Sequence, residues 1–197
     1  MESWAVIGLG NPGQKYSDTR HNLGFWILDL LAEENNRNFK KNKIYHALVT
    51  SMHFNNNKIF LIKPLTFMNE SGRYLSSLLS YINCPSQNVI LVHDDLTMPF
   101  ADLKISLNKG TGGHNGVANV ISNIGKSFIR FRIGIGSKLF PEMKLSDFVL
   151  SKMSDTELKS LESKKEFFLD AIFNIFENGV VATMNIINQT KTSQPTQ

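Results

Sequence analysis

A histidine and two aspartates follow apolar segments that lie far apart along the chain. His21 lies near the end of a glycine-rich stretch, residues 8–22, which begins after the apolar run at residues 4–7. Asp94 and Asp95 come after a second apolar run at residues 88–92. A carboxylate bonded to Nδ1–H of an imidazole fixes the tautomer and leaves Nε2 free to take a proton from water. The spacing does not decide between Asp94 and Asp95.

The elements that must bring these groups together are two short buried strands. Residues 4–7 are continuously apolar and residues 88–92 are apolar after Asn88, which is typical of central strands covered on both faces. The carboxyl ends of parallel strands share one edge of a sheet, where open α/β folds place their chemistry. Taken alone, His21 is more often a surface or helix-start residue and Asp94 a cap, so the hypothesis depends on both residues together.

Three asparagines on expected loops add amide groups. Asn11 lies in the first glycine-rich stretch, Asn69 in a loop at residues 65–72, and Asn115 beside His114 in a second glycine-rich turn. An amide carries a donor and an acceptor and can recognise a peptide-like group. The alternative is that Asn11 is an ordinary turn residue and that Asn69 and Asn115 are helix caps.

The glycines at positions 8, 10 and 13 also match the Gly-x-Gly-x-x-Gly pattern of dinucleotide-binding loops. In that pattern a helix opens at the third glycine and an acidic residue ends the next strand. Here residues 14–20 precede the next expected helix, and the strand expected at residues 44–52 has no acid at its end. We therefore favour a substrate-binding loop over a nucleotide site.

Other kinds of catalytic site find little support. The chain has no Gly-x-Ser-x-Gly elbow, and Cys84 stands beside Pro85 at the far end of an expected helix. The run from His93 to Asp95 lacks the spacing of a zinc site. We expect no cofactor, no metal and no covalent nucleophile, which leaves a water-attacking hydrolase or a binding protein.

Composition sets the broad class. The chain has 197 residues, 42% of them hydrophobic and 19% charged, which is enough for one domain with a substantial core. No apolar run approaches ~18 residues, no signal peptide is visible, and Cys84 is the single cysteine. These features predict a reduced, cytoplasmic protein without a membrane segment. The net charge of +4 is weak support for an anionic partner.

The order of elements predicts an α/β fold: a three-layer single domain over residues 1–189, with a twisted, mixed, mostly parallel sheet and helices on both faces. Residues 190–197 are expected to form a disordered tail. Strands are expected at residues 4–7, 44–52, 58–62, 88–92, 103–107 and 128–136. Helices are expected from residue 23, over residues 74–82 and 117–124, from the capping box that begins at residue 154 through residue 172, and over residues 180–187, with a mobile loop at residues 138–144.

Four motifs in register make the chain resemble the bacterial peptidyl-tRNA hydrolase family over about residues 3–187. They are Gly8-Leu-Gly-Asn-Pro-Gly-x-x-Tyr16-x-x-Thr-Arg-His21-Asn, Thr66-Phe-Met-Asn69, His93-Asp94-Asp95 and Gly112-Gly-His-Asn-Gly116. The resemblance implies a monomeric α/β enzyme of translation that cleaves the ester between peptide and tRNA. Its substrate would be peptidyl-tRNA released from ribosomes, so that the tRNA is recycled.

The resemblance also implies roles for single residues. His21 would be the general base that activates water, Asp94 would stabilise its working form, and Asn11 would distinguish a blocked amino group from a free one. Contacts to the acceptor end of tRNA or to the peptide are implied for Tyr16, Phe67, Asn69 and Asn115, with Met68 and His114 lining the same cleft. An ester with a ribose leaving group needs no covalent nucleophile, and Asn69 or Asn115 could donate to the oxyanion.

The chain departs from the family pattern at two positions. Thr97 replaces an acidic residue, and Ser106 stands where a basic residue is common, a loss for which Lys109 could substitute. The candidates for phosphate binding are Lys104, Lys109, Arg130, Arg132, Lys138 and Lys144, each of which would otherwise be solvated surface. A non-catalytic RNA-binding module with this fold is the main alternative, and the presence of His21, Asp94 and Asn11 together favours the enzyme.

Overall fold

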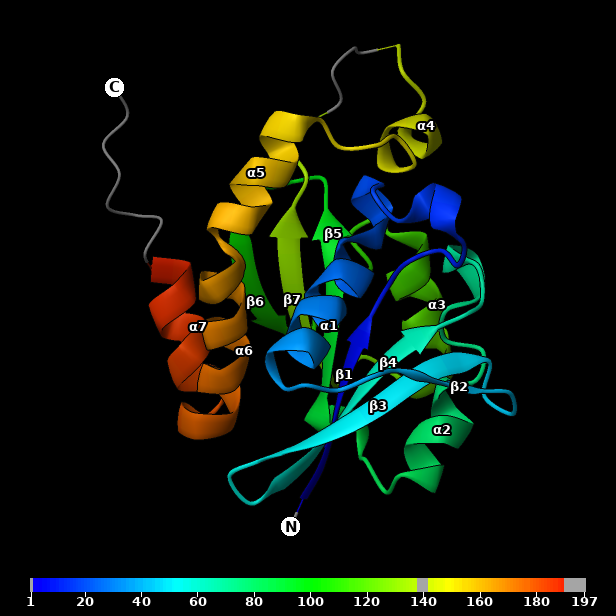
Figure 1. Cartoon of the computed structure of the whole chain (residues 1–197), viewed down its shortest axis with the longest axis vertical. Coiled ribbons are helices and arrows are strands. Elements are labelled where there is room, and N and C mark those ends of the chain that lie inside the picture. Colours follow the sequence, from blue (N-terminus) through cyan, green and yellow to red (C-terminus); the bar gives the residue numbers. More distant parts are fainter. Residues whose placement is uncertain (1, 138–141, 190–197) are drawn as a thin grey trace.

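The computed structural model describes residues 2–137 and 142–189, and these form an α/β domain around one seven-stranded sheet (Figure 1). The strand order is β2-β3-β4-β1-β5-β7-β6. The strands are β1 (Glu2–Gly8), β2 (Lys40–Asn42), β3 (Ala47–Phe54), β4 (Asn57–Pro64), β5 (Val89–Asp95), β6 (Leu103–Leu107) and β7 (Ile129–Gly134).

The four central strands β4, β1, β5 and β7 run parallel, while β2, β3 and β6 pair antiparallel at the two sides. The fully buried pattern of β5 fits a central strand with both faces covered. Because β1 and β5 are parallel neighbours, both strands end at the same edge of the sheet, β1 at Gly8 and β5 at Asp95. The expected fold class, with a mixed sheet and a parallel centre, is confirmed.

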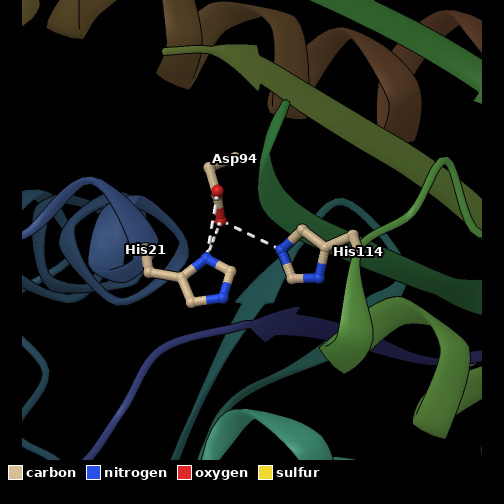
Figure 2. A group of neighbouring side chains, drawn as sticks. All are labelled: His21, Asp94 and His114. Carbon is tan, nitrogen blue, oxygen red and sulfur yellow. Dashed lines mark hydrogen bonds and ion pairs between the residues drawn. The ribbon is translucent and has the colours of Figure 1, made fainter. Parts of the chain in front are cut away.

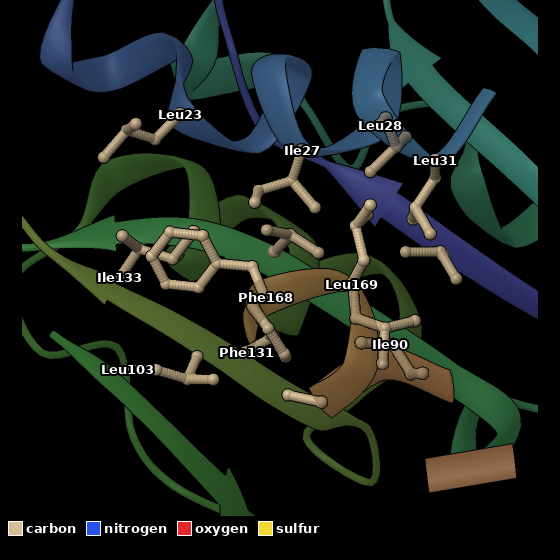
Figure 3. Packing of buried hydrophobic residues seen from close by; sticks show 14 of the residues in the cluster. Leu23, Ile27, Leu28, Leu31, Ile90, Leu103, Phe131, Ile133, Phe168 and Leu169 are labelled. Carbon is tan, nitrogen blue, oxygen red and sulfur yellow. The ribbon is translucent and has the colours of Figure 1, made fainter. Parts of the chain in front are cut away.

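Helices cover both faces of this sheet. The helices are α1 (Leu23–Glu34), α2 (Leu75–Tyr81), α3 (Asn115–Ile124), α4 (Leu145–Val149), α5 (Asp155–Ser163), α6 (Lys165–Asn178) and α7 (Val180–Gln189). Alternation along β1 divides the core, because Val6 packs in the cluster with α1 and α6, whereas Ala5 and Ile7 pack with α2 and α3. Figure 3 shows the first cluster, where Ile27 of α1 and Phe168 of α6 meet Phe131 of the sheet.

Several element boundaries differ from the sequence-based expectation. The strand expected from residue 44 begins at Ala47, because His46 has a left-handed backbone with φ 44°. Strand β2 and helix α4 were not expected. The helix expected over residues 154–172 is two helices, broken at Lys164, whose Nζ donates to the carbonyl of Ala101 at 3.1 Å.

The tail at residues 190–197 and the first part of the expected loop, residues 138–141, lie outside the described residues. The boundary of the domain at residue 189 and the disorder of the tail therefore stay predictions. Within residues 2–137 and 142–189, none of the helices is both long enough and apolar enough to cross a membrane.

Candidate active site

His21 and Asp94 meet at the carboxyl edge of the sheet, 73 residues apart in sequence (Figure 2). Nδ1 of His21 lies 2.9 Å from Oδ1 and 3.0 Å from Oδ2 of the Asp94 carboxylate. Because a carboxylate can only accept, Nδ1 carries the proton and donates it, which leaves the lone pair on Nε2. Both side chains are buried. The expected meeting of this histidine and this aspartate is confirmed.

A second imidazole bonds the same carboxylate. Nε2 of His114 lies 3.0 Å from Oδ1 of Asp94, while its Nδ1 accepts from the backbone N–H of Val117 at 3.3 Å. His114 therefore carries its proton on Nε2 and donates it to Asp94. The rings of His21 and His114 lie 4.7 Å apart between centroids. The sequence predicted His114 only as a residue lining the cleft, and not as a partner of Asp94.

Asp95 is engaged elsewhere. Its Oδ2 accepts from Nε of Arg132 at 2.7 Å, and its Oδ1 accepts from the backbone N–H and the hydroxyl of Thr97. The geometry thus separates the two neighbouring aspartates: Asp94 faces the imidazoles, and Asp95 holds Arg132. Thr97, where the family pattern has an acid, serves as a partner of Asp95.

His93 is a fully buried histidine beneath this group. Its Nδ1–H donates to the carbonyl of Asp94 at 2.6 Å, and its Nε2 accepts from Nε–H of Arg130 at 2.7 Å. Burial is the main reason why the pKa of His93 lies well below its usual value, and the neighbouring His114 and Arg130 lower it further. His93 therefore stays neutral and holds the backbone of Asp94 in place.

The Asp94 carboxylate is stabilised in its charged form. Burial by itself raises its pKa, but the electrostatic interactions and hydrogen bonds with His21 and His114 outweigh burial and hold the pKa well below the usual value. The site therefore presents a fixed negative charge to both imidazoles at neutral pH.

His21 belongs to a short 3-10 turn, Arg20–Asn22, that leads into α1. The buried Arg20 anchors this turn, because its Nη2 bonds both carboxylate oxygens of Glu157 at 2.6 and 2.8 Å. Its Nη1 donates to the hydroxyl of Ser151 and the carbonyl of Lys152. The imidazole is thus positioned by contacts to a segment more than 130 residues later.

Asn11 is held by two neighbouring elements. Its backbone N–H and carbonyl bond the side chain of Asn22 at 2.9 and 3.0 Å. Its Oδ1 accepts from the backbone N–H of Met68 at 2.9 Å. Since an N–H faces that atom, it is the oxygen, so the amide nitrogen Nδ2 remains as the group that can donate to a ligand.

Gly8 and Gly10 of the first turn allow close packing, and the turn does not have the geometry of the dinucleotide fingerprint. A Cβ on Gly8 would lie 2.3 Å from the carbonyl oxygen of Gly24 in α1, so the strand and helix can approach only without a side chain there. Residues 14–16 and 20–22 form 3-10 turns, and α1 begins at Leu23. The helix thus begins ten residues after Gly13, unlike in the dinucleotide fingerprint.

A cavity of about 240 Å³ opens beside the imidazoles. Its lining comes from the two histidine-bearing segments, the ends of β5 and β7, and α4: His21, Asp94, Asp95, Leu96, Thr111, Gly112, Gly113, His114, Asn115, Arg130, Leu145, Ser146 and Val149. Asn115 is the first residue of α3, and the N-cap is His114, so the alternative of Asn115 as the cap was wrong. The cavity therefore combines His21 with an amide at a helix start.

The other predicted contact residues lie around the short 3-10 turn Met68–Glu70 and the first glycine-rich turn. Met68 is buried, Asn69 and Phe67 are exposed, and Tyr16 is half-buried. None of these four lines the cavity within the described part of the chain. The N-cap of α2, the helix that follows, is Tyr74, so the alternative of Asn69 as its cap was wrong.

The predicted basic residues fall into two groups. Lys104, Lys109 and Lys144 are exposed, and Arg132 is partly exposed while it pairs with Asp95. Arg130, in contrast, is buried inside the site, and Lys138 lies outside the described residues. Ser106, which replaces a basic residue of the family pattern, is buried, and its hydroxyl has no partner among the residues described.

His21, Asp94 and His114 would also suit a metal ion, since their ligand atoms lie within 4.8 Å of one another. His21, Asp94 and His114 are far apart in the sequence, so no motif of adjacent residues predicted this cluster. The contacts of 2.9–3.0 Å are ordinary hydrogen-bond lengths, and each imidazole has a proton to donate. Protons alone therefore satisfy the geometry, and the absence of a metal stays a prediction.

Comparison with known proteins agrees with the geometry. A family model described as "Peptidyl-tRNA hydrolase" matches residues 5–195. The chain belongs to the peptidyl-tRNA hydrolase family. A peptidyl-tRNA hydrolase of Lactococcus lactis subsp. lactis (strain IL1403) is 43% identical over 186 residues, covering 93% of this chain and 98% of the relative. That of Fervidobacterium nodosum is 42% identical over 189 residues, covering 95% and 97%.

Solved structures give the same result. The crystal structure of peptidyl-tRNA hydrolase from Acinetobacter baumannii superposes with a TM-score of 0.87 at 30% identity, over 94% of each chain. The fold is thus that of the peptidyl-tRNA hydrolase family, and the chain is an enzyme with peptidyl-tRNA hydrolase activity, a function related to tRNA and translation.

Proposed function

We propose that this chain hydrolyses the ester between a peptide and tRNA by direct attack of water, with His21 as general base. The observation that carries the proposal is the bond between Nδ1 of His21 and the Asp94 carboxylate, beside an open cavity. With Nδ1 protonated, Nε2 takes a proton from water as the water attacks the ester carbonyl, and Asp94 stabilises the imidazolium that forms. The proton then passes to the ribose oxygen that leaves.

The oxyanion that forms during attack needs a donor. Asn115 lines the same cavity as His21 and is the nearest match to this role, with exposed Asn69 as the second candidate. Loss of one such donor costs about 2.7–4 kcal/mol in other enzymes. His114 also holds Asp94 in place, through the same carboxylate oxygen, Oδ1, that His21 contacts.

Selection of a blocked amino group fits Asn11. Because its Oδ1 is taken by Met68, its Nδ2–H can donate to the carbonyl that an N-acyl or peptidyl group provides. A free aminoacyl group has an ammonium at that place, which offers no acceptor. Tyr16, Phe67 and Met68, on the turns on either side, would contact the peptide or the acceptor end of tRNA.

The phosphates of tRNA would lie along the basic side of β6 and β7. Ile105 and Phe131 pack in the core with α6, whereas Lys104 and Arg132 are register partners on the other side of the sheet. Lys109 and Lys144 lie within two residues in sequence of Thr111 and Leu145, which line the cavity. We propose that these two lysines and Lys138 also bind tRNA phosphates. We propose that the enzyme acts as a cytoplasmic monomer on peptidyl-tRNA released from ribosomes, without a cofactor.

Replacement of His21 tests the proposal most directly. His21→Gln should lower kcat on N-acetyl-aminoacyl-tRNA about 1,000-fold, because general-base catalysis contributes 10²–10⁴-fold, while tRNA binding persists. The matched control is His53→Gln, at an exposed histidine of β3, which should keep the wild-type rate. A His21→Gln enzyme with near-normal kcat would refute the role of the base, and cleavage of unblocked aminoacyl-tRNA at an equal rate would refute the role of Asn11.

A further inference from the structure

Arg130 is a buried cation without a carboxylate partner. It is 3% exposed, its Nε–H donates to His93, and its Nη1 donates to the carbonyl of Gly110 at 2.6 Å. Both acceptors are uncharged. Burial, followed by the charge of Arg132, lowers the pKa of Arg130 to about 10, so the guanidinium remains charged at neutral pH.

The third nitrogen of this guanidinium, Nη2, is available to donate to a ligand. Among the described residues, the enclosed side-chain atoms without a partner are Nε of Arg20 and Oγ of Ser106. Nη2 of Arg130 makes no hydrogen bond in the same part of the chain, and it is not among those enclosed atoms, so it reaches solvent. Because Arg130 lines the cavity beside His21, a donor of a buried cation is available there.

The start of α3 adds to the positive potential of this cavity. The ten-residue helix begins at Asn115, which lines the cavity together with Gly112 and Gly113. The first N–H groups of a helix have no partner within the helix, and they carry a partial positive charge that attracts phosphates. A buried arginine and a helix N-terminus therefore converge on one space.

The two carboxylates that line the cavity are already bonded to other residues. Both oxygens of Asp94 accept from His21, and one of them also accepts from His114. The oxygens of Asp95 accept from Thr97 and Arg132. Among the buried cations of the described residues, Arg20 and Lys63 are ion-paired, whereas Arg130 makes no ion pair and is influenced by the charge of Asp95 only through space.

We propose that Arg130 and the N-terminus of α3 bind the 5′-phosphate of the substrate's 3′-terminal nucleotide. This inference rests on the proposed ester hydrolysis, because the ribose of that nucleotide carries the scissile ester and its own phosphate is the nearest anion. A guanidinium matches phosphate geometry better than an ammonium does. The enzyme thus recognises a nucleotide as the leaving group, and a simple alcohol ester lacks this contact.

The experiment compares two minimal substrates, N-acetyl-aminoacyl-adenosine with and without a 5′-phosphate. In the wild type the phosphate should raise kcat/KM about tenfold or more, as expected for one charged hydrogen-bonded contact. In Arg130→Gln the ratio should fall to about 1, and in Arg130→Lys it should be intermediate. Lys159→Gln, at an exposed lysine of α5, removes the same charge from the surface and should keep the wild-type ratio.

Equal losses on both substrates in Arg130→Gln would mean a purely structural role and would overturn the proposal, as would a wild-type ratio near 1. A wild type that does not cleave N-acetyl-aminoacyl-tRNA at all would instead refute the proposed function. If Arg130→Gln does not fold, inhibition of the wild type decides: adenosine 5′-monophosphate should inhibit at about tenfold lower concentration than adenosine, and equal inhibition would overturn the proposal.

Discussion

The two glycine-rich turns that build the site use glycine for different reasons. In the first turn, a Cβ would lie 2.3 Å from the carbonyl oxygen of Gly24 at Gly8, and 2.7 Å from the ring of Phe25 at Gly10. In the second turn, a Cβ on Gly112 or Gly113 would meet nothing within 4 Å, but the backbone has φ of +62° and +77°. Gly8 and Gly10 of the first turn are thus needed for close packing, whereas Gly112 and Gly113 of the second turn are needed for a left-handed backbone.

This difference separates the two histidines that share Asp94. His21 comes from the turn that is packed against α1 and cannot be loosened without disturbing the core. His114 comes from the turn that lies over the open cavity, where a change of backbone alters the site and leaves the core intact. The same sequence feature therefore predicts a cost in folding at one turn and a cost in catalysis at the other.

The largest effect on stability is expected at the first turn. Gly8→Ala should lower the free energy of unfolding by about 3 kcal/mol or more, because the methyl group would meet backbone that cannot move aside. Denaturant titration of the purified variant measures this loss. A loss below about 1 kcal/mol would contradict the packing argument.

The matched change at the second turn should cost less in stability. Gly113→Ala keeps open space around the new methyl group and pays about 1–2 kcal/mol for the left-handed backbone. The fold should persist, while kcat/KM on N-acetyl-aminoacyl-tRNA should fall through displacement of His114. A Gly113→Ala enzyme as unstable as Gly8→Ala, or with unchanged kcat/KM, would remove the distinction between the turns.

The contribution of His93 to the free energy of unfolding should depend on pH. The pKa of His93 is lowered in the folded protein, so below about pH 6.5 only the unfolded chain binds this proton. Stability should therefore fall with acidification by up to about 1.4 kcal/mol per pH unit from this residue. His93→Gln, which can still accept from Arg130, should have a shallower slope over about pH 5–6.5. Parallel stability curves for the two proteins would contradict this assignment.

The smallest effect is expected from a chelator. Nδ1 of His21 and Nε2 of His114 both donate hydrogen bonds to the Asp94 carboxylate. If these bonds hold the cluster together without a metal ion, dialysis against EDTA should leave kcat/KM unchanged. The assay on N-acetyl-aminoacyl-tRNA with and without chelator measures this. Lost activity that returns with zinc would make the cluster a metal site.

Local patterns predicted most of the fold. The strand at residues 103–107, the end of α3 before Gly125 and the capping box between Ser154 and Glu157 follow from neighbouring residues, and the structure confirms all three. The break at Lys164 was missed because no glycine or proline marks it in the sequence.

The site divides in the same way. The pairing of His21 with Asp94 could be predicted, because parallel strands bring their carboxyl ends to one edge. The bond from His114 to Asp94 could not, because the second turn follows an antiparallel strand and its path depends on two left-handed glycines. The buried position of Arg130 beneath that turn was missed for the same reason, since an arginine on a strand was expected at the surface.

The anchoring of Arg20 to Glu157 has a consequence for synthesis of the chain. A growing polypeptide contains His21 and Asp94 long before it contains the segment that bonds the neighbouring Arg20. Until about four-fifths of the chain has been made, the buried guanidinium has no carboxylate to meet, and the turn that carries the imidazole lacks its anchor. The order of synthesis therefore separates the appearance of the catalytic pair from the appearance of the contact that fixes its geometry.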